Sequence, residues 1–154
     1  MSALLCVAEL NAAYAAAIDA DRLDDWPHFF TEDCIYKITS AENHRRGYSA
    51  GVVYADSRAM LRDRVTALRS ANVYERQSYR HIVGLPVIGA VGAESITAQA
   101  PFLVLRIMRD GRTDVFATGV YLDRIREDAG RLRFVERIVV CDSSHFDTLL
   151  AIPL

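Results

Sequence analysis

The residues best placed for acid–base chemistry in this sequence are one histidine and one aspartate. His81 stands at the start of a predicted strand, and Asp19 follows the first predicted helix. In a cone formed by helices packed on a curved sheet, both positions can face one pocket. A histidine held by a carboxylate can act as a general base. Tyr36 or Tyr54 can then donate a hydrogen bond to an enolate-like intermediate, so the pattern allows a dehydratase or isomerase.

A purely structural role for His81 stays open beside the catalytic one. The ring can hydrogen-bond a neighbouring carboxyl or backbone group and do no chemistry. Placement within a fold is weak evidence for catalysis, because one fold hosts many functions. The sequence alone therefore favours the structural role.

Motifs for nucleotide and metal chemistry are missing from the sequence. Neither G-x-G-x-x-G nor G-x-x-x-x-G-K-[ST] occurs, and H-E-x-x-H is absent as well. A Rieske cluster needs two cysteines and two histidines, with a histidine shortly after each cysteine. Neither Cys34 nor Cys141 is followed by one. We therefore expect neither metal ligands nor cofactor-binding residues in this chain.

Composition predicts a single globular domain over residues 1–154. Hydrophobic residues make up 51% of the chain and charged residues 25%. The net charge of −2 is typical of a protein that does not bind nucleic acid. Seventeen arginines stand beside the single lysine, Lys37. Arginine is well suited to two-pronged ion pairs at interfaces, although coding bias would leave the same imbalance.

Three features of the sequence bear on location. The three cysteines lack a C-x-x-C pair, which argues against a disulfide scaffold. The first residues lack the basic and long apolar regions of a signal peptide. No stretch reaches 18 uncharged apolar residues, so we expect no membrane span and a cytoplasmic protein.

Hydrophobic spacing predicts the elements that would position Asp19 and His81. Helical spacing covers 3–18, a short helix covers 26–30, and Ser57 caps a third helix that runs to about Ser70. Helices come first and long strands follow, which is typical of an α+β fold with helices on one face of a curved, mostly antiparallel sheet. We read 40–47 as a polar loop and find no clear period after Asp142. The predicted strands are 34–39, 48–54, 80–90, 95–109, 113–126 and 132–141.

Several segments, in this order and spacing, resemble the small (β) subunit of aromatic-ring-hydroxylating dioxygenases. They are 26–36, 63–65, 79–84, 102–106, 116–123 and 137–143. The resemblance is nearest to the terephthalate dioxygenase branch, above all in 79–86, 101–108 and 148–154. The wider fold resembles the NTF2-like, or SnoaL-like, cone shared with ketosteroid isomerase and scytalone dehydratase.

This resemblance implies a non-catalytic, structural subunit. In that family a large α subunit carries the Rieske [2Fe–2S] cluster, the mononuclear Fe(II) and the substrate pocket. The β subunit forms a trimer within an α3β3 oxygenase. The complex would convert an aromatic acid such as terephthalate into a cis-dihydrodiol, with electrons from NAD(P)H through a reductase.

The same resemblance suggests which surfaces meet partner chains. We expect an arginine-rich surface and an apolar C-terminal tail buried against them. Candidate interface residues are the tail after Asp142 and the arginines Arg45, Arg46, Arg58 and Arg62.

Overall fold

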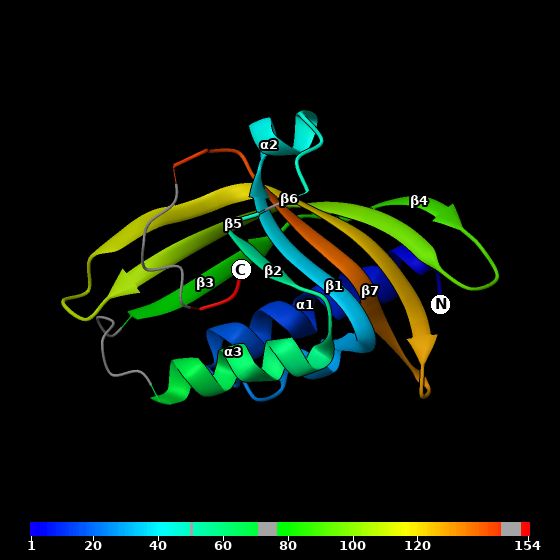
Figure 1. Cartoon of the computed structure of the whole chain (residues 1–154), viewed down its shortest axis with the longest axis horizontal. Coiled ribbons are helices and arrows are strands. Elements are labelled where there is room, and N and C mark those ends of the chain that lie inside the picture. The colour runs from blue at the N-terminus through cyan, green and yellow to red at the C-terminus, as the bar shows by residue number, and fades with distance from the viewer. Residues whose placement is uncertain (50, 71–76, 146–151) are drawn as a thin grey trace.

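A curved sheet arches over the main helices of the molecule (Figure 1). The structure is a computed structural model and describes residues 1–49, 51–70, 77–145 and 152–154. The helices are α1 (Ala3–Asp19), the 3₁₀ helix η1 (Trp26–Phe29), α2 (Ala41–Arg45) and α3 (Arg58–Ser70). The strands are β1 (Phe30–Ser40), β2 (Val53–Ala55), β3 (Gln77–Val83), β4 (Val87–Val91), β5 (Ile96–Met108), β6 (Thr113–Asp128) and β7 (Arg131–Cys141). None of these helices is both long and apolar enough to cross a membrane.

The sheet follows the order β2-β1-β7-β6-β5-β3, and β4 pairs with β5 beside this path. Every pairing is antiparallel except that of β1 with β7, which is parallel. The expected α+β cone with a mostly antiparallel sheet is therefore confirmed. The one parallel pair places β1 directly beside β7, so the strands that lie between them in the sequence are on either side of this pair in the sheet.

Local chemistry explains where the predicted elements were wrong. The segment 40–47 contains helix α2, because the Ser40 hydroxyl accepts the Asn43 backbone N–H at 3.1 Å and caps a first turn. The predicted strand 80–90 divides into β3 and β4. Pro86 lies in the gap and has no N–H for a sheet, while Gly84 donates its N–H to the Pro101 carbonyl at 2.8 Å.

The core lies between the concave face of the sheet and helices α1 and α3. Helix α1 begins where Ser2 accepts the Leu5 backbone N–H at 3.2 Å. It buries Tyr14 among rings from η1, β1 and β7. The neighbouring ring pairs are mostly edge-to-face, with centroids 5.2–5.8 Å apart between Trp26, Phe30 and Tyr36. Such pairs stabilise more than their buried area alone and hold α1 and β1 in a fixed orientation.

Gly119 on β6 lies opposite Cys141 on β7, with the β7 backbone close against it. A Cβ atom there would lie 2.0 Å from the Val140 carbonyl oxygen and 2.9 Å from its carbon. Both are backbone atoms, so no rotamer change relieves the clash. We expect Gly119→Ala to destabilise the fold by about 1–3 kcal/mol, read as a lower melting temperature. Gly92→Ala is the control, because its Cβ would meet nothing closer than 3.5 Å. Equal melting temperatures for the two variants would contradict this explanation.

Two of the three cysteines are sealed in the core. Cys34 and Cys141 are buried, while Cys6 is half-buried. Burial raises the pKa of the Cys34 thiol to about 11 and that of Cys141 to about 12. Both therefore stay protonated at pH 8, and the thiolate is the reactive form.

We expect a disulfide reagent at pH 8 to modify Cys6 rapidly and the other two cysteines only after denaturation. Counting released chromophore in native and denatured protein measures this. Cys6→Ser should abolish the rapid phase, and a rapid phase that persists in that variant would contradict the prediction.

Candidate functional site

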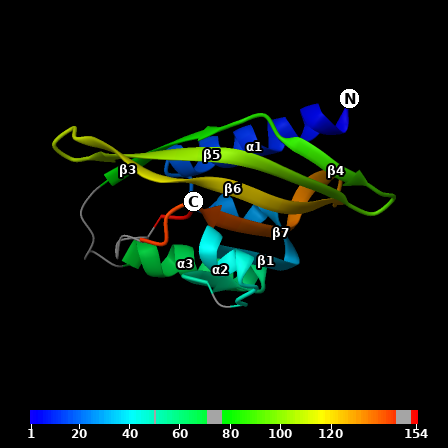
Figure 2. The same ribbon diagram turned by 90° about the horizontal axis from the view of Figure 1, so that it is seen from above.

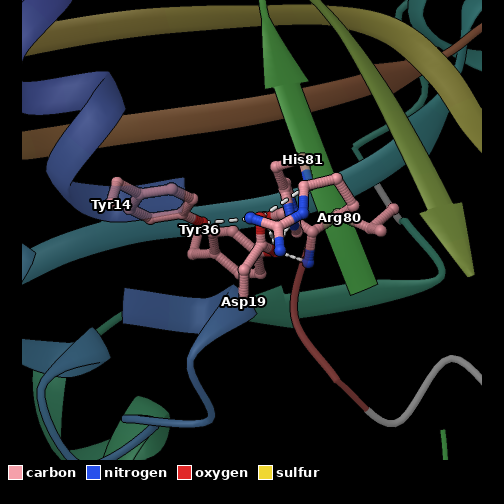
Figure 3. Close-up of polar contacts among 6 residues, drawn as sticks. Tyr14, Asp19, Tyr36, Arg80 and His81 are labelled. Atoms are coloured by element: carbon pink, nitrogen blue, oxygen red, sulfur yellow. Dashed lines mark hydrogen bonds and ion pairs between the residues drawn. The ribbon is translucent and has the colours of Figure 1, made fainter. Parts of the chain in front are cut away.

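Asp19 and His81 meet where the end of α1 lies against β3 (Figure 3). Asp19 Oδ1 lies 2.7 Å from His81 Nδ1, and Asp19 Oδ2 accepts the His81 backbone N–H at 2.8 Å. The Asp19 side chain is 5% exposed and the His81 ring 0% exposed. The exposed guanidinium of Arg80 lies 3.9 Å from the same carboxylate. The structure thus brings the two predicted residues together.

The contact also covers one point on a free edge of the sheet. Strand β3 is the last strand in the order and pairs only with β5. Its free edge presents backbone N–H groups, which need partners or water. The Asp19 carboxylate pairs with the backbone N–H and with the ring Nδ1 of His81. A purely structural role of His81 predicts this arrangement. The same arrangement also holds the ring in the orientation that a general base would need.

Tyr36 lies in the core, but its hydroxyl is already engaged by the chain itself. Tyr36 and Tyr14 donate hydrogen bonds to the backbone oxygen of Leu154, at 2.9 and 2.7 Å. The Leu154 N–H donates back to the Tyr36 hydroxyl at 3.2 Å, and Trp26 Nε1 donates to the Tyr14 hydroxyl at 3.1 Å. Burial raises the pKa of both tyrosines. Both hydroxyls therefore act as neutral donors at physiological pH.

Residues 152–154 fill space inside the cone. Ile152 is 8% exposed and Leu154 1% exposed, and both belong to the core. In Figures 1 and 2 the end marked C lies between the sheet and the helices. The prediction that the tail is buried against partner chains is wrong for these residues, since their own chain buries them. Residues 146–151 lie outside the described part of the chain.

Tyr54 does not join the site. It lies on β2, at the opposite end of the sheet order from His81, and its side chain is half-exposed. Of the predicted donors to a reaction intermediate, only Tyr36 reaches the interior.

A buried ion pair is the polar feature that the sequence reasoning missed. Arg137 donates from Nε and Nη2 to the two carboxylate oxygens of Asp123, both at 2.8 Å, and both side chains are 0% exposed. Nη2 also donates to Asn11 on α1. The guanidinium carbon lies 3.8 Å from the ring centre of Tyr121 and 3.9 Å from that of Phe134. Burial works to lower the pKa of Arg137, but the Asp123 carboxylate outweighs it and raises the pKa, so the arginine stays charged.

Arg58, one of the predicted interface arginines, is held by hydrogen bonds within its own chain. Arg58 donates two hydrogen bonds to the Phe30 carbonyl, at 3.0 and 2.6 Å, and its side chain is only 11% exposed. These contacts argue against the predicted interface role of Arg58, because the buried Phe30 carbonyl needs this donor. Arg45, Arg46 and Arg62 are exposed and remain candidates.

A groove of about 400 Å³ runs between α1 and β3. Its walls include the alanine-rich face of α1 and, at one end, Asp19, Arg80 and His81. Among the described residues, no three His, Cys, Asp or Glu side chains lie close enough to hold a metal ion. The site thus combines an oriented histidine with a cone interior that the chain itself occupies.

Comparison with known proteins places the chain in a family. Residues 1–138 match the SnoaL-like domain. The chain is 54% identical over 148 residues to subunit β1 of the terminal oxygenase component of terephthalate 1,2-dioxygenase from Comamonas sp., covering 96% of each chain. It is 38% identical to the anthranilate 1,2-dioxygenase small subunit of Burkholderia cepacia, covering 94% of this chain and 90% of that one.

A solved structure agrees with these sequence comparisons. It is assigned to the β subunit of an aromatic-ring-hydroxylating dioxygenase from Novosphingobium aromaticivorans. The two chains share 38% identity and superpose with a TM-score of 0.91, over 99% of this chain and 97% of that one. The resemblance found in the sequence is confirmed. The chain belongs to the SnoaL-like domain family and, within it, to the β subunits of aromatic-ring-hydroxylating dioxygenases.

Proposed function

We propose that this chain is the non-catalytic β subunit of an oxygenase that cis-dihydroxylates an aromatic acid such as terephthalate. One observation carries the proposal: identity of 54–55% over 96% of the chain to the two terephthalate dioxygenase β subunits of Comamonas sp.. In this proposal a large α subunit is the principal partner. Three copies of each subunit form an α3β3 complex in the cytoplasm, and a reductase supplies electrons from NAD(P)H.

The iron chemistry belongs to the α subunit in this proposal. A Rieske cluster takes two cysteines and two histidines. Here Cys34 and Cys141 are buried in the hydrophobic core, and His81 Nδ1 is held by Asp19. The described side chains therefore do not fit the cluster's ligand set. The large subunit would supply the Rieske cluster, the Fe(II) and the aromatic-acid pocket, while this chain supports the assembly.

The occupied interior supports a structural role for this chain. In the alternative function, a stand-alone dehydratase or isomerase, His81 would be the base and Asp19 its orienting carboxylate. The 2.7 Å contact between them favours that alternative. However, a substrate would need space beside these groups, and Tyr36 would need a free hydroxyl. Leu154 takes that hydroxyl and lies in the core, which favours the structural reading.

Co-purification tests the proposal. The chain would be tagged in its native host, purified gently, and analysed by light scattering, iron assay and absorption spectroscopy. We expect a larger chain in equal amount, with a Rieske spectrum and a mass that fits α3β3. A colourless, iron-free oligomer of this chain alone would overturn the proposal. A His81→Ala activity screen would then test the stand-alone enzyme.

A further inference from the structure

The groove between α1 and β3 lies outside the cone, along a free edge of the sheet. Helix α1 runs beside β3 and β4 there (Figure 2), and the groove of about 400 Å³ separates the helix from Val83 and residues 84–86. Its helical wall consists largely of alanines. Ala12 and Ala16 are exposed, whereas Tyr14 between them points into the core. The groove therefore opens to solvent on the side of α1 that is turned away from Tyr14.

Strand β3 presents backbone groups along this groove. In an antiparallel pair, the backbone groups of successive residues alternate between the partner strand and the free side. Gly84 donates its N–H toward β5, to the Pro101 carbonyl, and His81 donates its N–H to the opposite side. The same alternation turns the N–H and carbonyl of Val83 outward, and no other described strand pairs with β3 on this side. Such an edge is a template for another extended chain.

Two buried polar atoms of residues that line the groove call for a partner. Asn11 is 2% exposed, and its Nδ2 has no hydrogen-bond partner in the described part of the chain. The same is true of His81 Nε2, which acts as an acceptor because Nδ1 donates its proton to the Asp19 carboxylate. Buried polar atoms nearly always have partners. A donor and an acceptor together match a peptide group, which offers one carbonyl oxygen and one N–H.

The length and charge of the groove indicate what kind of segment fits it. Along α1 it extends from Ala8 to Asp19, about 16 Å at about 1.5 Å per residue, which equals about five residues of extended chain. The exposed Leu85 offers an apolar contact at one end. At the other end (Figure 3), the Arg80 guanidinium is 66% exposed while the Asp19 carboxylate is buried. The matching segment is therefore apolar and carries a carboxylate near one end.

A second copy of this chain fits the groove poorly. Two β3 edges that paired with each other would form a two-fold dimer, which leaves the third of three copies without a partner. The strand at the opposite end of the sheet, β2, has only three residues. In the complex proposed above, the large subunit is then the partner that supplies the segment.

We propose that an extended segment of the large subunit lies in this groove and adds to β3 as a further strand. Its backbone pairs with the outward N–H and carbonyl of Val83, and its peptide groups supply partners to Asn11 and His81. A carboxylate of the segment pairs with Arg80. This inference rests on the proposed function and assigns a surface through which this chain holds its partner.

Two arginine substitutions on α1 test the groove in the assembled oxygenase. Ala12→Arg fills the groove, whereas Ala13→Arg adds the same charge at an exposed position that does not line it. The large subunit and the tagged, full-length chain are co-expressed, and the purified complex is diluted while light scattering records its mass. We expect Ala12→Arg to raise the concentration at half-dissociation by about tenfold or more, and Ala13→Arg to leave it unchanged.

Two substitutions of Val83 separate backbone pairing from side-chain packing. Val83→Pro removes the outward N–H, and an edge strand accepts proline where the N–H faces away from the sheet. It should weaken assembly by about tenfold, because an added strand is held by backbone hydrogen bonds, whereas Val83→Ala keeps the N–H and should weaken assembly less. Hydrogen exchange decides if Val83→Pro fails to fold. The Val83 amide of the wild type should exchange about tenfold more slowly in the complex than in the isolated chain.

Three results would overturn the inference. They are equal dissociation of the Ala12→Arg and Ala13→Arg complexes, a Val83 amide that exchanges equally fast in the complex and in the isolated chain, and loss of self-association of the isolated chain in Ala12→Arg. The last would assign the groove to a second copy. In each case the wild-type complex still forms, so the proposed function stands. If the wild-type chain binds no large subunit, the proposed function fails and this inference fails with it.

Discussion

Replacing Arg137 by methionine is expected to lower the free energy of unfolding by about 3–5 kcal/mol. The change leaves the Asp123 carboxylate 0% exposed and without its bidentate partner. It also removes the donor to Asn11 and the cation stacked on three aromatic rings. Urea unfolding followed by circular dichroism measures the loss.

A surface arginine and a double variant control this prediction. Arg126→Met removes a partly exposed arginine 3.7 Å from Asp33 and should cost at most about 1 kcal/mol. Adding Asp123→Leu to Arg137→Met should recover part of the stability, because no unpaired charge then remains buried. A double variant less stable than Arg137→Met alone would contradict the view that the unpaired carboxylate dominates the cost.

Asp19→Ala has the second largest expected effect, a loss of about 2–4 kcal/mol. It leaves two buried donors of His81 without an acceptor, the backbone N–H and the ring Nδ1, and each unpaired buried group costs about 1–3 kcal/mol. Thermal and urea unfolding of the isolated chain measure the effect. Asp25→Ala, which breaks an exposed ion pair with Arg22, should cost less than about 1 kcal/mol.

The same variant separates the two readings of the Asp19–His81 pair. If the pair is structural, oxygenase assembled with Asp19→Ala keeps its turnover per intact complex and loses only stability. If the pair is catalytic in a stand-alone enzyme, Asp19→Asn, which keeps the shape and one oxygen acceptor, would still abolish the activity of the isolated chain. Retained activity in the Asp19→Asn variant would rule out a catalytic role for the Asp19–His81 pair.

Much of the fold follows from local patterns in the sequence. Alternating apolar residues locate β5, β6 and β7 to within about two residues at each end, and Ser57 marks the start of α3 through its hydrogen bond from Met60. The boundary between η1 and β1 was harder to predict from the sequence. The short helix was expected over 26–30 and the next strand over 34–39, yet β1 already begins at Phe30. Polar side chains such as Glu32 are compatible with either state, and only pairing with β7 decides between them.

The candidate site was predictable only in part. Asp19 and His81 could be paired from the sequence because the order of elements places both toward the cone. Arg137 could not be found in this way, since an arginine in a strand is read as exposed. Its burial depends on the register that sets it opposite Asp123. The positions of Ile152 and Leu154 were missed because so short an apolar segment has no period, and only the curved sheet with its helices provides the space that they fill.

The parallel pairing of β1 with β7 has a consequence for biosynthesis. Tyr36 lies opposite Arg137, so the two strands meet across about 100 residues of intervening chain. Contacts so distant along the chain form late and slow folding. While the ribosome makes the segments between them, β1 has only the short β2 beside it. An incomplete product that stops before β7 would keep one edge of β1 unpaired, which is a template for aggregation.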